Sequence, residues 1–285
     1  MSRVLVTGGA GFIGSFVVDR LRAAGHEAVI FDIRESPHHV PGEVPTVIGD
    51  VLDYEAVRAA ARGCDAIAHL AAAADVGEVA ADPAPAERIN AGGTFNVLEA
   101  AREAGVSRVL YASTIWVYSG ADGAVDEDAS LSPPAHLYTA TKLAGEHYCR
   151  AYHELYGVDA TILRFGIPYG PRARPAAVVP AFVIKALRGE PLTIEGGGEQ
   201  TRRFVYVEDL ADGMVRALAP VAANRTYNLV CDEEVSIRQI AATVSELVGD
   251  VEIEHTAGRP ADFIGRAEIS GARAAQELGW RPEVD

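Results

Sequence analysis

The feature that most constrains this chain is a glycine-rich run, Thr7-Gly8-Gly9-Ala10-Gly11-Phe12-Ile13-Gly14, directly after the short apolar run Val4-Leu5-Val6. In this spacing the first glycine permits a tight turn and the second lets a pyrophosphate approach the backbone. The third lets a helix pack closely on a strand. The amide groups and the positive dipole end of that helix then meet the phosphates. The run therefore predicts a dinucleotide site at a strand-to-helix turn.

An acidic residue, Asp32, follows Gly14 by 18 residues, at the end of a second apolar run at 28–31. A carboxylate in this position binds the ribose 2′-hydroxyl and repels a 2′-phosphate, which favours NAD over NADP. Arg34 leaves the tolerance of NADP open, because a nearby arginine can accept the extra phosphate. NAD is the predicted cofactor.

Short β-branched runs alternate with amphipathic stretches through the first two thirds of the chain. We expect strands at 4–6, 28–31, 45–48, 66–68, 108–112 and 160–164, and helices at 11–24, 54–62, 86–104 and 138–156. Such alternation is typical of βαβ units, whose right-handed crossovers build a doubly wound sheet with its ligand crevice at the carboxyl ends of the strands. The expected fold class is α/β, a doubly wound parallel (Rossmann) sheet with a smaller, discontinuous C-terminal substrate-binding region.

The pattern changes after residue 164. Residues 166–200 hold five of the 15 prolines and a glycine triplet at 196–198, which predicts loops around one helix at 178–188. A strand at 226–230 should rejoin the main sheet, and Ser236 should cap a helix at 236–247. The acidic, proline-containing stretch 119–135 predicts an exposed loop. We therefore assign residues 1–165 and about 201–230 to an NAD-binding domain, and about 166–200 and 231–285 to the substrate-binding region.

Charge and composition narrow the possible partners. The net charge of −15 argues against a nucleic-acid partner, because neutralising phosphates requires clustered lysine and arginine. No apolar run has the length of a membrane span, and no signal peptide is visible, so we expect a cytoplasmic protein without a membrane partner. The eight histidines lack metal-ligand spacing, and no metal is assigned.

Tyr138 and Lys142 stand four residues apart, which places them on one face of the expected helix. A phenol with a pKa near 10 is a weak base at neutral pH, but a close ammonium group and an oxidised nicotinamide favour its phenolate. Thr114 ends a strand 24 residues before Tyr138, where its hydroxyl could bind the same substrate oxygen. Thr114, Tyr138 and Lys142 are the candidate catalytic residues, with Tyr138 taking a proton from a sugar hydroxyl.

Together these residues resemble the extended short-chain dehydrogenases of the NAD-dependent epimerase/dehydratase type. Further similar segments are Gly49-Asp50-Val51, His69-Leu70-Ala71-Ala72, Asn90-Ala91-Gly92-Gly93-Thr94, Arg164 to Arg172, Gln200 to Asp209, Gly258-Arg259-Pro260-Ala261-Asp262 and Leu278-Gly279-Trp280-Arg281-Pro282. The resemblance implies a nucleotide-diphosphate sugar as substrate and a homodimer joined through the helices at 86–104 and 138–156.

The resemblance also implies the binding residues, several of which the motifs above already suggest. The candidate cofactor-binding residues are Gly8, Gly11, Phe12, Ile13, Gly14, Asp32, Ile33, Arg34, Asp50, Val51, Leu70, Ala71, Ala72, Asn90, Tyr138 and Lys142. The candidate substrate-binding residues are Thr114, Tyr138, Arg172, Arg202, Arg259 and Asp262. Two arginines, Arg202 and Arg259, suit a diphosphate, which arginine can bind in a bidentate manner.

The positions after Thr114 bear on the reaction. In this family, 4,6-dehydratases carry an acid/base pair and decarboxylases a glutamate near this place, whereas this chain has Ile115 and Trp116. Neither side chain can transfer a proton, so elimination lacks its general acid and base. The expected reaction is epimerisation at carbon 4 of a UDP-hexose or UDP-hexuronate through a 4-keto intermediate. The alternatives are a 4-ketoreductase or dehydrogenase, a 4,6-dehydratase and a nucleotide-binding protein without catalysis.

Two departures concern the sugar. Many epimerases carry asparagine where Ile167 stands, which suggests an altered substrate. Arg172, Arg174 and Arg266 are additional cations in the substrate-side segments, and they could bind the carboxylate of a uronic acid or lie solvated at the surface.

Overall fold

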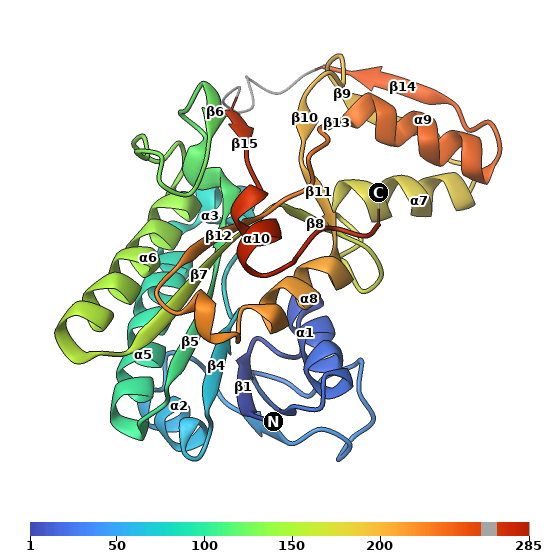
Figure 1. Cartoon of the computed structure of the whole chain (residues 1–285). Helices are drawn as coiled ribbons and strands as arrows, with labels where there is room; N and C mark the ends of the chain where they lie inside the picture. Colours follow the sequence, from blue (N-terminus) through green and yellow to red (C-terminus); the bar gives the residue numbers. More distant parts are fainter. Residues whose placement is uncertain (258–266, 285) are drawn as a thin grey trace.

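A central sheet of seven parallel strands organises the molecule, in the order β12-β7-β5-β4-β1-β2-β3 (Figure 1). The computed structural model describes residues 1–257 and 267–284. The strands are β1 (Arg3–Thr7), β2 (Glu27–Asp32), β3 (Thr46–Ile48), β4 (Ala66–His69), β5 (Arg108–Thr114), β7 (Asp159–Phe165) and β12 (Thr226–Leu229). The chain runs from β1 outward to β3 and then crosses back to β4, so the strand order reverses between β1 and β4. This confirms the predicted doubly wound sheet, whose ligand crevice is expected at that point.

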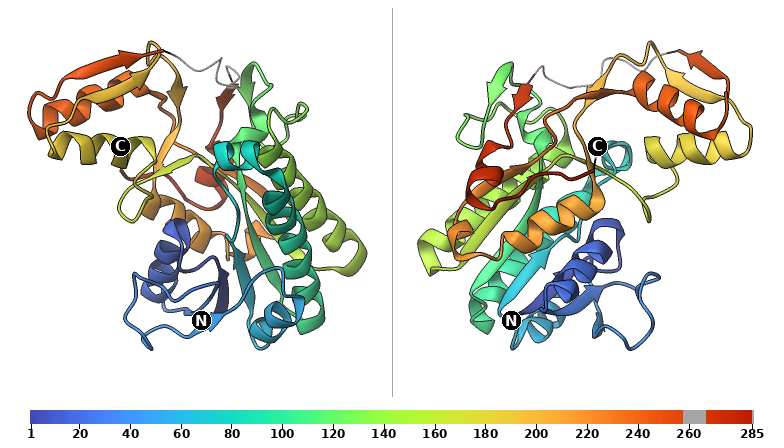
Figure 2. Two further views of the ribbon diagram at one scale, coloured as in Figure 1. Left: turned by 180° about the vertical axis from the view of Figure 1, so that it is seen from behind. Right: turned by 45° about the vertical axis from the view of Figure 1, so that its right-hand side comes forward.

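Helices cover both faces of the sheet (Figure 2). The strands alternate their side chains, so that Val4 and Val6 enter one core while Leu5 enters the other. The first core lies under α1 (Phe12–Ala23), α8 (Val207–Arg216) and α10 (Ala272–Glu277). The second lies under α2 (Tyr54–Ala61), α5 (Gly93–Ala104) and α6 (Leu137–Tyr156).

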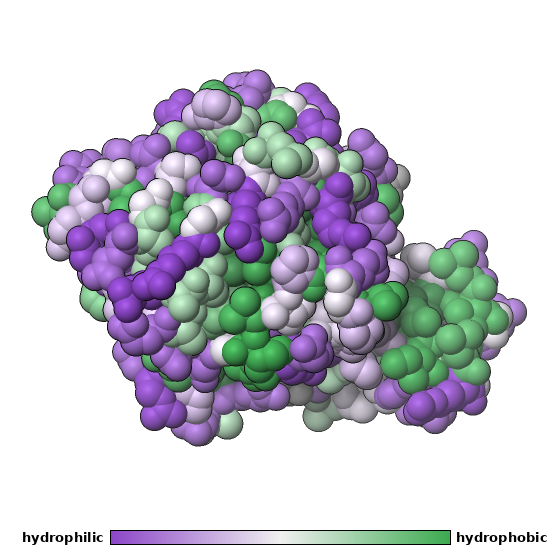
Figure 3. Space-filling model, turned by 90° about the horizontal axis from the view of Figure 1, so that it is seen from below, coloured by the Kyte–Doolittle hydropathy of each residue, from purple (hydrophilic) through white to green (hydrophobic). Residues whose placement is uncertain are grey.

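A smaller lobe projects beyond the carboxyl ends of the strands and has its own apolar core. It contains α7 (Val178–Leu187), β9 (Leu192–Glu195), α9 (Ile237–Val248) and β14 (Ile253–Thr256). Ser236 caps α9 and forms a capping box with Gln239, which confirms the predicted N-cap. Seen from below, this lobe shows a largely apolar face (Figure 3).

The prediction that residues 166–200 form only loops around one helix was wrong. The segment also contains β9 and β8 (Ile167–Tyr169). Their parallel partners are β14 and β11 (Phe204–Tyr206), which come later in the chain. Local composition could not show either pairing.

The prediction of an exposed loop at 119–135 was also wrong in part. This stretch holds β6 (Gly123–Val125), which pairs in parallel with β15 (Ala267–Ile269). Glu127 is 7 % exposed, and its carboxylate accepts a hydrogen bond from the backbone N–H of Asn228 at 2.8 Å. A distant strand therefore holds part of this acidic stretch against the sheet.

The helix expected at 86–104 is present, but its first turns are π-helical and not α-helical. α4 (Pro83–Ala86) is followed by a π-helical stretch at Glu87–Gly92, and α5 begins only at Gly93. A Cβ at Gly93 would lie 2.7 Å from the Val51 side chain, so the helix approaches the loop after β3 too closely for a larger residue. π-Helical turns are frequent at functional sites.

The remaining elements are α3 (Val76–Ala81), β10 (Thr201–Arg202), β13 (Val235–Ser236) and two 3-10 turns, η2 (Ile115–Tyr118) and η3 (Pro220–Ala222). Across residues 1–257 and 267–284, no helix combines the length and the apolar character needed to span a membrane.

Candidate active site

The three spaced glycines lie where β1 turns into α1, and each is required for a different reason. Gly8 has φ +72°, and a Cβ there would lie 2.8 Å from the backbone nitrogen of Ala71. A Cβ at Gly14 would lie 2.1 Å from the carbonyl oxygen of Gly8. At Gly11 the one close neighbour of such a Cβ is the Gly8 carbonyl oxygen, at 3.1 Å. Gly8 and Gly14 thus close the turn, while the surroundings of Gly11 leave room for a ligand.

The start of α1 fits a dinucleotide. Its N-cap residue, Gly11, has an extended backbone and no side chain that could accept from the first amide groups of the helix. These amides are the usual phosphate-binding groups of such turns. Asp32 faces the turn, because its Oδ2 accepts a hydrogen bond from the Ala10 N–H at 3.0 Å. The geometry therefore matches the cofactor site that the glycine spacing predicts.

The other candidate cofactor residues surround this turn. Phe12 and Ile13 begin α1 and pack partly against the core, while Ile33 and Arg34 are exposed after β2. Asp50 accepts from the Leu52 N–H at 2.9 Å, and the Val51 carbonyl accepts from Asn96 at 2.9 Å. These contacts fix the loop between β3 and α2.

The segment after β4, which includes Leu70, Ala71 and Ala72, forms the opposite side of the crevice. The Asn90 side chain holds it there: its Oδ1 accepts from the Ala73 N–H at 2.8 Å, and its amide donates to the Ala73 carbonyl at 3.0 Å. The same amide donates to Thr141 on α6 at 2.9 Å. Asn90 thus ties the cofactor side to the helix that carries Tyr138.

His69 anchors the end of β4. Its ring nitrogens are hydrogen-bonded to Thr7 Oγ1 at 2.7 Å and to Thr94 Oγ1 at 3.0 Å, and the side chain is buried. Burial lowers the pKa of His69 to about 3, so the imidazole is neutral. His69 thus joins the end of β4 to β1 and to α5.

Thr114, Tyr138 and Lys142 come together as the sequence predicts. Thr114 ends β5, and the other two lie one turn apart on the buried face of α6. The Thr114 hydroxyl lies near enough to the Tyr138 side chain to act on its pKa. The Lys142 ammonium lies 5.1 Å from the centre of the Tyr111 ring.

The surrounding side chains alone do not lower the pKa of Tyr138, and the effect of an oxidised nicotinamide on this pKa stays a prediction. Burial raises the pKa of Tyr138 to about 12, and the opposing influence is the nearby Thr114 hydroxyl. Burial also lowers the pKa of Lys142 to about 8. The reason is that a buried site disfavours both charged forms, the phenolate and the ammonium.

A buried polar network behind these residues was missed in the sequence. Glu146 is fully buried and lies one turn beyond Lys142 on α6. Its carboxylate accepts from Ser113 at 2.7 Å and from two nitrogens of Arg164 at 2.9 and 2.8 Å. Although burial acts to raise it, Arg164 holds the pKa of Glu146 below its ordinary value. The four-residue spacing from Lys142 was the signal that could have revealed this network.

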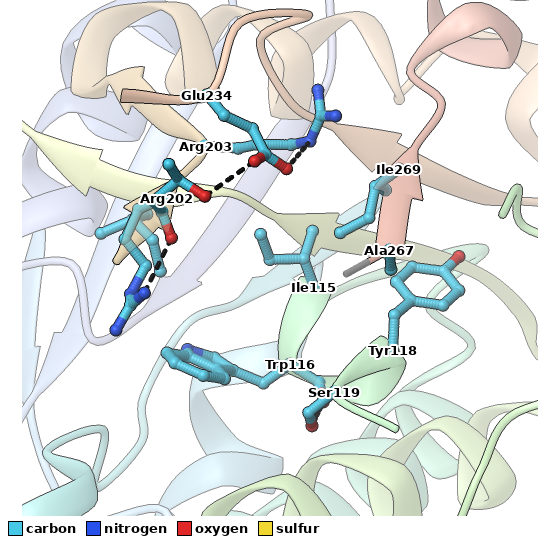
Figure 4. A pocket seen from close by; sticks show the side chains of 11 residues that line it. Ile115, Trp116, Tyr118, Ser119, Arg202, Arg203, Glu234, Ala267 and Ile269 are labelled. Atoms are coloured by element: carbon cyan, nitrogen blue, oxygen red, sulfur yellow. Dashed lines mark hydrogen bonds and ion pairs between the residues drawn. The ribbon is translucent and has the colours of Figure 1, made fainter. Parts of the chain in front are cut away.

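A pocket opens beyond Thr114 at the end of β5 (Figure 4). Trp116 and Arg202 lie on one side of it, Tyr118 and Ala267 on the other, and Ile115 lies between them. The lining residues are Ile115, Trp116, Tyr118, Ser119, Ile167, Thr201, Arg202, Arg203, Glu234, Ala267 and Ile269. Sequence reasoning missed Tyr118, Ser119, Glu234, Ala267 and Ile269, because no local motif marks them.

Arg202 and Arg203 both line this pocket, but their side chains make different contacts. The Arg202 guanidinium lies over the Trp116 ring, 5.6 Å from its centre, and donates to the Thr201 carbonyl. Arg203 is 9 % exposed and donates to the carbonyls of Cys231 at 2.9 Å and Asp232 at 2.7 Å. Arg203 therefore holds the backbone after β12, whereas Arg202 lines the pocket over an aromatic surface.

The remaining candidate cations are engaged within the chain or lie outside the described residues. Arg172 pairs with Asp19 at 2.8 Å and packs over the Phe16 ring, while Arg174 pairs with Asp75. A substrate carboxylate would have to compete with these partners. Arg259, Asp262 and Arg266 fall in residues 258–266, outside the described part of the structure.

Comparisons with known proteins agree with this geometry. The model of the NAD dependent epimerase/dehydratase family matches residues 4–229. The chain is 36% identical to a UDP-glucose 4-epimerase of Mycolicibacterium smegmatis, over 99% of this chain and 94% of that protein.

Solved structures give the same result. The UDP-glucose 4-epimerase of Thermotoga maritima, solved with UDP-glucose, superposes with a TM-score of 0.93 at 29% identity and covers 99% of this chain and 94% of that one. The Thermus thermophilus UDP-glucose 4-epimerase complex with NAD superposes with a TM-score of 0.87 at 34% identity and covers the same shares.

Relatives with other activities have similar identity. A dTDP-glucose 4,6-dehydratase of Neisseria gonorrhoeae is 31% identical over 98% of this chain and 90% of that protein. UDP-glucuronic acid decarboxylase 1 of Xenopus tropicalis is 32% identical over 99% of this chain and 69% of that protein. Together with the glycine turn and the Tyr138–Lys142 pair, these matches establish that the chain belongs to the NAD-dependent epimerase/dehydratase family, the extended short-chain dehydrogenases whose cofactor is NAD.

Proposed function

We propose that this protein is a nucleotide-sugar 4-epimerase that acts on a UDP-hexose or UDP-hexuronate. The observation that carries the proposal is the environment beyond Thr114, where Ile115 and Trp116 line the pocket. Glu234, the carboxylate among the described lining residues, accepts from Thr201 at 2.8 Å and lies 3.5 Å from Arg203. An elimination or decarboxylation assisted by an acid at this position lacks a free group to carry it.

Each residue of the site has a role in this reaction. Bound NAD supplies reversible oxidation at carbon 4 of the sugar. Thr114 holds the 4-hydroxyl, and Tyr138 takes the proton from this hydroxyl and later returns it. Lys142 stabilises the phenolate by its charge once the site is filled. The closeness of Thr114 to Tyr138 lets both groups act on one substrate oxygen.

The substrate diphosphate needs cationic side chains that can bind it. Arg202 is the described arginine that we assign to the diphosphate, because it lines the pocket and arginine suits phosphate oxygens. We assign the same role to Arg259 and contact with the nucleoside ribose to Asp262. We also assign the candidate cofactor residues around the glycine turn to NAD. Fixing the diphosphate leaves the sugar free to present either face.

Two further proposals concern the division of the chain into domains and its oligomeric state. We assign residues 1–165 and about 201–230 to the NAD-binding domain and the lobe of α7 and α9 to the substrate. Ala274, Leu278 and Trp280 pack in the core under the central sheet, so we place them with the NAD-binding domain.

A homodimer through α5 and α6 is supported by exposed apolar side chains on these helices, namely Phe95, Leu155 and Tyr156.

The test is proton NMR of the purified protein with UDP- and dTDP-sugars, neutral and uronic, without added cofactor. We expect one sugar to settle into a mixture of carbon-4 epimers without net NADH. A 4-ketoreductase or dehydrogenase would instead consume added cofactor stoichiometrically. Loss of water or of carbon dioxide from the sugar would contradict the proposal and indicate a dehydratase or a decarboxylase.

A further inference from the structure

The segment between β8 and α7, residues 170–177, is attached to both sides of the cofactor crevice. Arg172 reaches α1, where it pairs with Asp19 at 2.8 Å and its guanidinium lies 4.1 Å from the centre of the Phe16 ring. Arg174, two residues later, pairs with Asp75, which caps α3. We call residues 170–177 the strap.

The two attachment points belong to opposite sides of the strand-order reversal. α1 follows the glycine turn of β1 and packs on one face of the sheet with α8. Asp75 ends the segment that begins with Leu70 after β4, and α3 packs against α6 on the other face. The glycine turn and the segment after β4 approach closely at Gly8 and Ala71. The strap therefore joins the two sides of the crevice above this point.

Asp19 also holds a second loop. Its Oδ2 accepts from Arg172, while its Oδ1 lies 3.1 Å from Nε2 of His39, on the loop that follows Asp32 and Arg34. One carboxylate on α1 thus joins the strap to the loop expected beside the adenosine ribose. Removing the charge of Asp19 would therefore weaken the attachment of both loops at this end of the crevice.

The backbone of the strap has features of a segment that can open. Gly170 at its start has φ +136°, and a Cβ there would lie 2.9 Å from the Val207 side chain, so only glycine fits this pivot. Both ion pairs are partly exposed, with Arg174 at 55% and Arg172 at 25% side-chain exposure. Such pairs are individually weak, so the strap can open without unfolding the sheet.

We propose that the strap, through the Arg172–Asp19 and Arg174–Asp75 pairs, closes over bound NAD and slows its release. This proposal rests on the assignment of the cofactor to the crevice and not on the sugar reaction. The strap residues act by holding loops and not by contact with the reacting atoms.

The experiment measures the release of NAD from the NAD-loaded protein. Alcohol dehydrogenase and ethanol convert released NAD to NADH, which is followed by its absorbance. The variants are Arg174→Ala, Asp75→Asn and their combination, because asparagine keeps the cap of α3 while removing the charge. We expect each single variant to release NAD up to about fivefold faster, and the combination no faster than either one.

The other attachment is tested by Asp19→Asn, alone and with Arg174→Ala, where loss of both pairs should accelerate release up to about 25-fold. Arg225→Ala is the matched control, because Arg225 and Glu277 form a surface pair of similar exposure away from the crevice. Release at the control rate in both Arg174→Ala and Asp19→Asn would overturn the proposal. Purely additive effects of Arg174→Ala and Asp75→Asn would also contradict it. Thermal unfolding of each variant separates a loosened strap from a loosened fold.

Discussion

The cofactor side and the substrate side of the site differ in how far apart along the chain their parts lie. Gly8, Gly11, Gly14 and Asp32 belong to one β1-α1-β2 unit. The pocket beyond Thr114 instead combines η2 with residues near positions 167, 202, 234 and 267. A site made by one supersecondary unit is fixed by backbone geometry, whereas the pocket depends on how distant segments pack.

The largest effect should come from the residue at which both sides meet. Tyr138→Phe keeps the ring in the core but removes the hydroxyl, so turnover should fall by about 100- to 10,000-fold. NAD binding and thermal stability should stay close to wild type. The measurements are initial rates by NMR and titration with NAD. Near-normal turnover in a folded Tyr138→Phe variant would refute the assignment of the base.

A substitution in the glycine turn should weaken NAD binding without affecting the substrate pocket. Gly11→Ala adds a methyl group whose close neighbour within the chain is one carbonyl at 3.1 Å, so the fold should survive. Its NAD affinity should fall by roughly 100-fold, because the methyl group occupies the approach of the pyrophosphate.

Two further glycine variants serve as controls for Gly11→Ala. Gly14→Ala places its methyl group 2.1 Å from the Gly8 carbonyl and should destabilise the fold by about 1–3 kcal/mol. Gly92→Ala, where a Cβ meets no atom of the described residues within 4 Å apart from its own helix backbone, should change neither quantity. Equal NAD affinity in Gly11→Ala and Gly92→Ala would remove Gly11 from the binding site.

The neighbouring residues Arg202 and Arg203 test the substrate side, because we assign them different roles. Arg202→Ala should weaken binding of the UDP-sugar about tenfold, because a charge-assisted contact with the diphosphate is lost. Arg203→Ala should chiefly lower the melting temperature, since two backbone carbonyls lose their buried donor. Calorimetric titration with UDP and thermal unfolding measure the two effects. If Arg203→Ala alone weakens UDP binding in a stable protein, the roles of the two residues must be exchanged.

A further effect concerns pH and the end of β4. The pKa of His69 is about 3 in the folded protein, below the value of about 6.5 in an unfolded chain. The unfolded state therefore binds more protons between these values, and stability falls as the pH is lowered through this window. His69 should contribute a slope of about 1.4 kcal/mol per pH unit between pH 6 and 4.

Denaturant titrations at several pH values test this slope. His69→Gln should flatten it, whereas His255→Gln, at an exposed position on β14, should leave it unchanged. An unchanged slope in His69→Gln would show that the buried imidazole does not limit acid stability.

The success of the sequence predictions follows the same division. Gly8, Gly14 and the Tyr138–Lys142 spacing were readable because turns and helix faces are local features. The pairing of β6 with β15 and the place of Glu234 were not readable, because these contacts join segments far apart in the chain. The effect of burial on the Tyr138 pKa was missed for another reason. Helix spacing brings Lys142 near, but it does not reveal that burial dominates over the charge.

The central claim is that one carbon of the sugar is oxidised and then reduced within the same active site. The most direct measurement uses the UDP-sugar that the NMR panel identifies, deuterated at carbon 4, with the wild-type protein and no added cofactor. We predict that the carbon-4 epimer keeps its deuterium and that no NADH accumulates. Replacement of the deuterium by solvent hydrogen, or one NADH formed per sugar converted, would contradict the account.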